Sequence, residues 1–367
     1  MSSNDAPARP PRNRIWHKLL LSLVPAAALV WLMQSGSLPI VPRREELGRV
    51  ASWTVPAYVG VWSISYFFRL IRWWFLLAAV EVLPLWTVVR AGAVGLFAIA
   101  LLPFRMGEVV RPLLIRRPPR LTFWAASGTV GAERVLDALS VSVLLLVGLR
   151  FAKPLDKLPD HIGTLPIHVA IVPGLALTCA LVFASGCVVM GVFYFWRDFA
   201  RRLTERVVGL VSLPLARWLA AKIEQMAQGL GFLARPRQAV PFMLLTLAYW
   251  GLNAVGFWLL AVGCGIDIGF FGATATMGVV ALGIIVPATP GFFGAFQLAI
   301  YAGLAMYLPP DAVTDAGSVY AFLGYVLPIG LTMFVGVLGV LAKPRALLAL
   351  TGEPEQLAPS ASENLAR

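Results

Sequence analysis

Long apolar runs alternate with short polar segments along this chain. Residues 19–33 form an uncharged apolar run, and further apolar runs lie near 50–68, 91–104, 121–149, 168–196, 238–263, 268–308 and 317–342. A helix needs about 20 residues to cross the roughly 30 Å hydrocarbon core of a bilayer. Most of these runs are long enough to cross once, so the pattern predicts an all-α polytopic membrane protein.

Two of the runs do not fit a simple crossing. Run 91–104 is too short, and run 268–308 is interrupted by Pro287, Pro290 and Gly291. Prolines and glycines break helices because proline lacks a backbone donor and glycine tolerates sharp turns. We therefore expect 84–115 and 268–308 to be re-entrant or broken helical hairpins.

The distribution of positive charge separates this topology from one with simple crossings. Cytoplasmic loops of membrane proteins carry an excess of lysine and arginine. If 84–104 crossed completely, a loop with five arginines would lie outside, namely Arg105, Arg111, Arg116, Arg117 and Arg120. If 84–115 instead dips in from the cytoplasm and returns, that loop stays inside.

Applied along the whole chain, this rule predicts about six full transmembrane helices, two re-entrant hairpins and cytoplasmic termini. The segments would be a basic tail at 1–18, a first membrane repeat at 19–150, an external loop at 151–167, a second membrane repeat at 168–342 with a cytoplasmic amphipathic segment at 197–237, and a polar tail at 343–367. The two repeats have the same order with opposite orientation, which is typical of an inverted repeat. The alternatives are a bundle of eight or nine simple spans and, for 19–33, a signal peptide instead of a retained span.

Composition supports a membrane protein and excludes several other classes. The chain has 367 residues, of which 59 % are hydrophobic and 13 % charged, and its mean hydropathy is +0.80. The net charge of +12 suits loops facing anionic lipid, so we expect no nucleic-acid partner. The three cysteines and three histidines show no ligand spacing, and no phosphate-binding loop is present. We therefore expect no metal, no cofactor and no nucleotide-driven motor.

The stretch PFRMGEVVRP at 103–112 places charges at the first break. Pro103 removes a donor and Gly107 allows a sharp turn, so Arg105, Glu108 and Arg111 would project from the break. Glu108 and Arg111 are three residues apart and could pair on a helix. One arginine would then be in excess, and guanidinium groups bind anionic head groups bidentately.

The second break, VPATPGFFGAFQ at 286–297, carries no charge. We expect it to offer backbone donors at the start of a helix near Gly291, where the helix dipole favours an anion. Pro287 and Pro290 would shape this break. The alternative is a simple turn between two ordinary spans.

Ionisable side chains also occur inside two apolar spans. Glu133, Arg134 and Asp137 lie in span 121–149, where burying them is costly without a partner. They could pair with Arg105 or Arg111, form a protonatable site, or only hold the re-entrant loop. Arg69 and Arg72 lie among aromatic residues, which favours interfacial lipid contacts over direct substrate contact.

These motifs resemble those of the lysylphosphatidylglycerol synthase transmembrane family, also called flippase-like. The similarity covers nearly the whole chain. It is carried by P-x-R-x-G-E-x-x-R from Pro103 to Arg111, E-R-x-x-D from Glu133 to Asp137, R-x-x-R-W from Arg69 to Trp73, and P-x-x-P-G from Pro287 to Gly291. Phe292 and Gln297 replace a glycine and a glutamate that family members often carry, so no carboxylate role is expected there.

The resemblance implies a bacterial or archaeal cytoplasmic membrane protein that handles lipids, as a stand-alone membrane domain without the soluble aminoacyl-transferase domain. The favoured function is a lipid translocator for a phospholipid or lipid-linked head group, with anionic membrane lipids as partners and no catalytic residues. The residues expected to bind the head group are Arg105, Glu108, Arg111, Glu133, Arg134, Asp137, Pro287, Pro290 and Gly291. One alternative is a membrane transferase acting on a lipid or lipid-linked sugar, with Glu108, Glu133 or Asp137 as the base. The other is a non-catalytic partner of a lipid-modifying enzyme. The sequence leaves the lipid, the direction and energy source of transport and the oligomeric state open.

Overall fold

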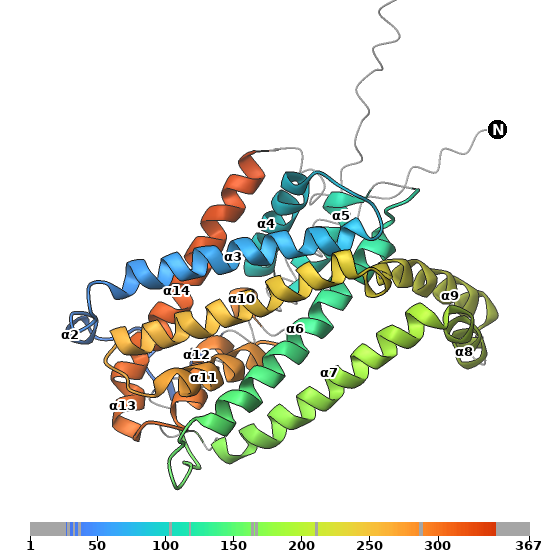
Figure 1. The fold of residues 1–367 in the computed structure, drawn as a ribbon. Coiled ribbons are helices and arrows are strands. Elements are labelled where there is room, and N and C mark those ends of the chain that lie inside the picture. Colours follow the sequence, from blue (N-terminus) through green and yellow to red (C-terminus); the bar gives the residue numbers. More distant parts are fainter. Residues whose placement is uncertain are drawn as a thin grey trace, which may run out of the picture.

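In the computed structural model, the described residues form a bundle of helices (Figure 1). The description covers residues 38–102, 105–116, 119–162, 165, 168–209, 212–285 and 289–342, together with 27, 30, 31, 34 and 35. The only β-type pairing in these ranges is an isolated bridge between Ile162 and Leu165. The all-α membrane-protein fold expected from the sequence is confirmed.

Five long helices dominate the described part of the bundle: α3 (Thr54–Ala78), α6 (Phe123–Phe151), α7 (Val172–Phe195), α10 (Pro236–Gly263) and α14 (Ala316–Leu341). Each has at least 24 residues, which at 1.5 Å per residue exceeds the thickness of a bilayer core. By length and composition, the segments containing α7, α10 and α14 are apolar enough to cross a membrane. Helices α3 and α6 are equally long but contain charged residues. The five helices match five of the six expected spans, and most of 19–33 lies outside the described residues.

Two pairs of short helices occupy the positions expected for the broken hairpins. The first pair is α4 (Leu85–Leu101) and α5 (Gly107–Ile115), and the second is α11 (Gly269–Gly283) and α12 (Ala295–Leu304), which follows the 3-10 turn η4 (Pro290–Phe292). Leu83, just before the first pair, shares a hydrophobic core with Ile115 at its end. Ile266 and Leu304 flank the second pair in the same way. Within each pair the two helices pack against each other, as the arms of a hairpin would; that either pair returns to the side of the membrane from which it entered stays a prediction.

Unusual backbone conformations mark both breaks. Arg105 has φ +54° in the first break, while Gly291 and Phe292 have φ +60° and +61° in the second. Left-handed conformations are costly for residues with a side chain and persist where the surroundings fix them. Gly107 has a different role from the sharp turn expected of it. It begins α5, and a Cβ at Gly107 would collide with the carbonyl oxygen of Gly95 in α4.

The packing of the two halves shows a repeated pattern. Helix α3 packs against α4 and α10 packs against α11, while α5 packs against α6 and α12 against α14. Across the halves, α4 packs against α14 and α11 against α6, and the two helices α3 and α10 lie side by side (Figure 1). Exchanging the halves leaves this set of contacts unchanged. The pattern supports two structural repeats, although their opposite orientation in a membrane stays a prediction.

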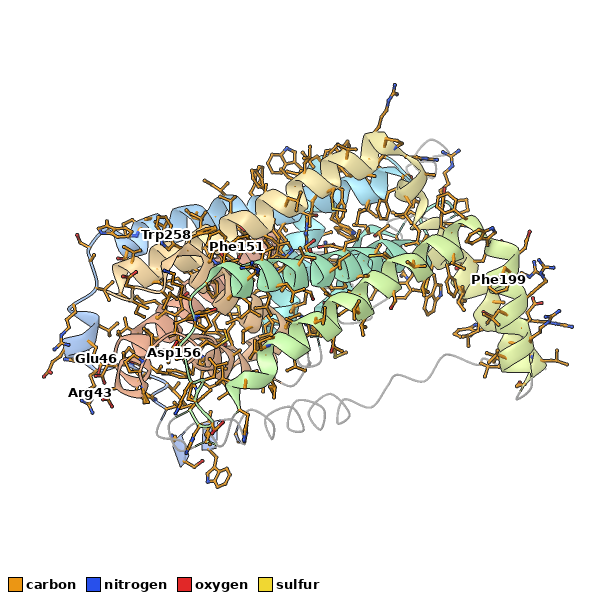
Figure 2. All side chains as sticks on the ribbon, turned by 60° about the horizontal axis from the view of Figure 1, so that its bottom comes forward. Arg43, Glu46, Phe151, Asp156, Phe199 and Trp258 are labelled. Atoms are coloured by element: carbon orange, nitrogen blue, oxygen red, sulfur yellow. The ribbon has the colours of Figure 1, made fainter. Side chains whose placement is uncertain are left out.

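The two ends of the bundle differ in their charged elements. At one end lie α2 (Arg44–Leu47), the segment before η2 (Val169–Ile171) and α13 (Pro310–Thr314); Figure 2 shows Arg43, Glu46 and Asp156 there. At the opposite end lie η3 (Gly231–Ala234) and two amphipathic helices, α8 (Arg197–Gly209) and α9 (Leu213–Gln228). Figure 2 shows Phe199 of α8 at that end. The described residues of the basic segment, 197–209 and 212–237, therefore lie opposite those of the loop at 151–162, as the charge rule requires.

Candidate functional site

A buried ion pair joins α3 to α6 at the centre of a charged cluster. Arg72 of α3 is completely buried and donates to both carboxylate oxygens of Asp137 over 2.5 and 2.6 Å, and to Glu133 over 2.9 Å. The prediction that Arg72 is an interfacial lipid contact is wrong. Asp137 and Glu133 are one helical turn apart, so both carboxylates face α3 and compensate the cost of burying the guanidinium.

Arg111 of α5 enters the same cluster from the other side. Its Nη1 lies 3.1 Å from Oε2 of Glu133, and its guanidinium carbon lies 4.2 Å from the ring centre of Trp73. Of the alternatives left open for Glu133, an ion pair with Arg111 across the bundle is formed. The expected pair between Glu108 and Arg111 is not formed. Arg111 points toward α6, and Glu108 instead lies 3.9 Å from Arg105 and 4.0 Å from Arg134.

Helix α10 contributes residues that the sequence did not indicate. The indole Nε1 of Trp250 donates to Asp137 over 3.2 Å, and the hydroxyl of Thr246 accepts from Arg72 over 3.3 Å. Asn253, also buried, donates to the hydroxyl of Ser65 in α3. Thr246, Trp250 and Asn253 recur at one-turn spacing, and this polar stripe on an apolar helix is the signal that could have revealed them.

A cavity of about 150 Å³ lies beside this cluster, between the two halves. Three residues predicted for the site line it: Arg105, Glu108 and Gly291. Arg69 lines it too, together with the aromatic side chains of Trp62, Tyr249, Trp250, Phe257, Phe292, Phe296 and Tyr325.

The other predicted site residues have different positions. Arg111, Glu133, Arg134, Asp137 and Pro290 are not among the residues that line the cavity. Arg134 pairs with Glu133 over 2.8 Å and with Asp137 over 3.3 Å. Pro287 lies outside the described residues, as does Pro103 of the first motif.

The two breaks meet at the cavity. The guanidinium carbon of Arg105 lies 5.0 Å from the ring centre of Phe292, a cation–π contact between the two hairpins. Gly291 packs so closely that an added Cβ would lie 3.1 Å from the hydroxyl of Tyr325. The helix after the second break begins at Ala295, four residues later than Gly291. Its cap residue Gly294 donates its backbone N–H to Oε1 of Gln297 over 2.7 Å, so this donor already has an internal partner.

Positive charge exceeds negative charge among the described residues of the cluster and the cavity. Five arginines (Arg69, Arg72, Arg105, Arg111 and Arg134) stand against three carboxylates (Glu108, Glu133 and Asp137), an excess of two positive charges. Arg69 has no ion-pair partner within 4.0 Å in the described part of the chain. The Nε atoms of Arg69 and Arg105 are buried without a hydrogen-bond partner there.

Comparison with known proteins gives one match. Residues 15–332 match a protein-family model described as lysylphosphatidylglycerol synthase TM region. No curated protein and no solved structure matches the chain. The matched range includes both breaks and the whole charged cluster, and the fold around them is that of an all-α membrane protein. The chain therefore belongs to the lysylphosphatidylglycerol synthase TM region family.

Proposed function

We propose that this membrane protein is a lipid translocator that holds an anionic head group in the cavity between its two halves. The observation that carries the proposal is the position of Arg69 and Arg105. Both line a largely aromatic and apolar cavity. Among the described residues, Arg69 has no ion-pair partner within 4.0 Å, and Arg105 has only Glu108 at 3.9 Å. A guanidinium in such surroundings requires an anion, and a phosphate oxygen accepts its hydrogen bonds well.

The size of the cavity suits a head group and excludes a whole lipid. One water needs about 10–15 Å³ on the same measure, so about 150 Å³ holds a polar group of several heavy atoms. The acyl chains would remain outside, against the apolar surface of the bundle. If only the head group lies between the two repeats, the repeats can rock around this fixed site and expose it to each side of the membrane in turn.

The predicted site residues divide into two roles. Arg105, Glu108 and Gly291 would contact the head group, together with Arg69. Arg111, Glu133, Arg134 and Asp137 would hold α5 against α6 and so fix the first break. Because Glu133 pairs with Arg72, Arg111 and Arg134 at once, losing it would leave Arg111 without its ion-pair partner and Arg72 and Arg134 with Asp137 alone.

The proposal is tested by reconstituting the protein into liposomes that contain head-group-labelled phospholipids. A translocator changes the fraction of label accessible to a membrane-impermeant quencher while the mass of each lipid stays constant. Arg105→Ala should abolish this change. Arg44→Gln, at the far end of the bundle, is the matched control and should retain it.

Two results would contradict the proposal. If the labelled lipid gained or lost mass with a purified donor, the membrane transferase hypothesis would replace it. If neither leaflet exposure nor lipid mass changed and an enzyme co-purified with the protein, the chain would be a partner subunit.

A further inference from the structure

We infer that the cavity selects a doubly charged phosphate, as found in lipids that end in a phosphomonoester or a diphosphate, over the singly charged phosphodiester of common phospholipids. This inference rests on the proposed function, because it names the class of head group that the same cavity would hold.

The first observation is that two like charges line one small cavity. Arg69 of α3 and Arg105 of the first break both line it, and their side chains interact electrostatically with each other. Among the described residues that line the cavity, the only carboxylate is Glu108, which lies 3.9 Å from Arg105 and 4.0 Å from Arg134. Like charges in an apolar cavity repel each other strongly unless an anion lies between them.

The second observation is that the rest of the cluster cannot supply that anion. Glu133 and Asp137 are already bound by Arg72, Arg111 and Arg134 at distances between 2.5 and 3.3 Å. Three guanidinium groups therefore share two carboxylates, which leaves one positive charge inside the cluster. Arg69, Arg105 and Glu108 add one more positive charge at the cavity.

The third observation is geometric. Each of the two cavity arginines has a buried Nε without a hydrogen-bond partner among the described residues. Both groups are donors. A terminal phosphate offers three oxygens that accept hydrogen bonds, whereas a phosphodiester has only two unesterified oxygens.

Charge balance then separates the two phosphate classes. A phosphomonoester carries about −1.5 to −2 charges near pH 7, with a second pKa of about 6. Its charge matches the total excess of two positive charges, one at the cavity wall and one in the adjoining cluster of Arg72, Arg111, Arg134, Glu133 and Asp137. A phosphodiester carries one negative charge and would leave one guanidinium uncompensated, which is costly in a site shielded from water.

The test compares two lipids with identical acyl chains, phosphatidic acid and phosphatidylglycerol, for binding to the full-length protein in a nonionic detergent. At pH 8 the protein should bind phosphatidic acid at least about tenfold more tightly, because hydrogen bonds between charged groups are worth that factor or more. Lowering the pH from about 8 to about 5 should weaken the binding of phosphatidic acid and leave phosphatidylglycerol unchanged, since only the monoester loses a charge.

Arg69→Gln should remove the preference and make the two affinities similar, whereas the control Arg44→Gln should keep it. If Arg69→Gln does not fold, the pH series on the unaltered protein decides alone. Equal affinities without pH dependence would overturn the selection of a dianion while leaving lipid translocation intact.

Inorganic phosphate and diphosphate, used as competitors, distinguish a lipid from a soluble anion. Competition by these ions that is much weaker than the binding of phosphatidic acid supports a lipid ligand. If free phosphate binds as tightly as the lipid, the ligand is a soluble anion, and the proposed lipid translocation fails with it.

Discussion

Arg72 and Asp137 form a bidentate ion pair that joins α3 to α6, with both carboxylate oxygens within 2.6 Å of the guanidinium nitrogens. Arg72 is 0 % exposed and Asp137 6 % exposed. Removing one member of such a pair leaves a buried charge without compensation, which costs more than the pair itself contributes. The pair therefore sets the stability of the region that carries the first break.

Asp137→Asn should lower the free energy of unfolding by about 3–5 kcal/mol, because Arg72 then stays buried without its main partner. Thermal unfolding of the purified protein in detergent measures this as a lower midpoint. Glu205→Gln is the matched control, since the pair between Glu205 and Arg201 on α8 is exposed and should leave the midpoint unchanged. Equal shifts in the two variants would contradict the structural role of Asp137.

Gly95→Ala should destabilise the first hairpin by about 1–3 kcal/mol, because a Cβ at this position collides with the buried side chain of Arg111. The displaced Arg111 would also lose its contact with Glu133. The rate at which labelled lipid moves between the leaflets in the liposome assay should therefore fall. Gly131→Ala on α6 is the control, because a Cβ there meets no atom within 4 Å. Gly95→Ala should have a lower unfolding midpoint and slower lipid movement in the liposome assay than Gly131→Ala.

Gln297→Ala should lower the free energy of unfolding by about 1–3 kcal/mol, since the buried N–H of Gly294 loses its acceptor. Gln297→Glu keeps an acceptor at the start of α12, where the helix dipole favours a negative charge, and should retain more stability. The ranking is checked by thermal unfolding of both variants. A glutamate variant less stable than the alanine variant would show that the cap does not hold the second break.

The re-entrant arrangement predicts that Val82 and Arg116 lie on the same side of the membrane. Single cysteines at these two exposed positions, in a chain whose Cys179, Cys187 and Cys264 are replaced by serine, should react with an impermeant maleimide from one side only. A cysteine at Asp156 should react from the opposite side. Labelling of Val82→Cys and Arg116→Cys from opposite sides would mean that the segment containing α4 and α5 crosses the membrane once and does not return.

Most of the helical framework could be predicted because hydropathy and helix breakers act locally. Runs of apolar residues predicted the five long helices, and the short run 91–104 and the interruption of run 268–308 at Pro290 and Gly291 predicted the two breaks. Residue charge alone also indicated that Glu133 would need a partner such as Arg111, because a carboxylate inside a span is costly.

The partner of Arg72 could not be predicted from its neighbours in the sequence. Aromatic residues flank an arginine both at a membrane interface and in a buried cluster, so local composition does not separate the two environments. Only the packing of α3 against α6 decides between them. The roles of Tyr249 and Trp250 could not be predicted either. In the sequence they are aromatic residues of an apolar span, and only the packing of α10 against α3 brings them to the cavity and the cluster.

The most direct test of the head-group site is a structure of the protein determined in lipid nanodiscs that contain phosphatidic acid. We expect density for a phosphate within hydrogen-bonding distance of Arg69 and Arg105, with the acyl chains leaving the cavity toward the bilayer. Phosphate density found only at the surface of α8 and α9, with the cavity holding water or an acyl chain, would contradict it.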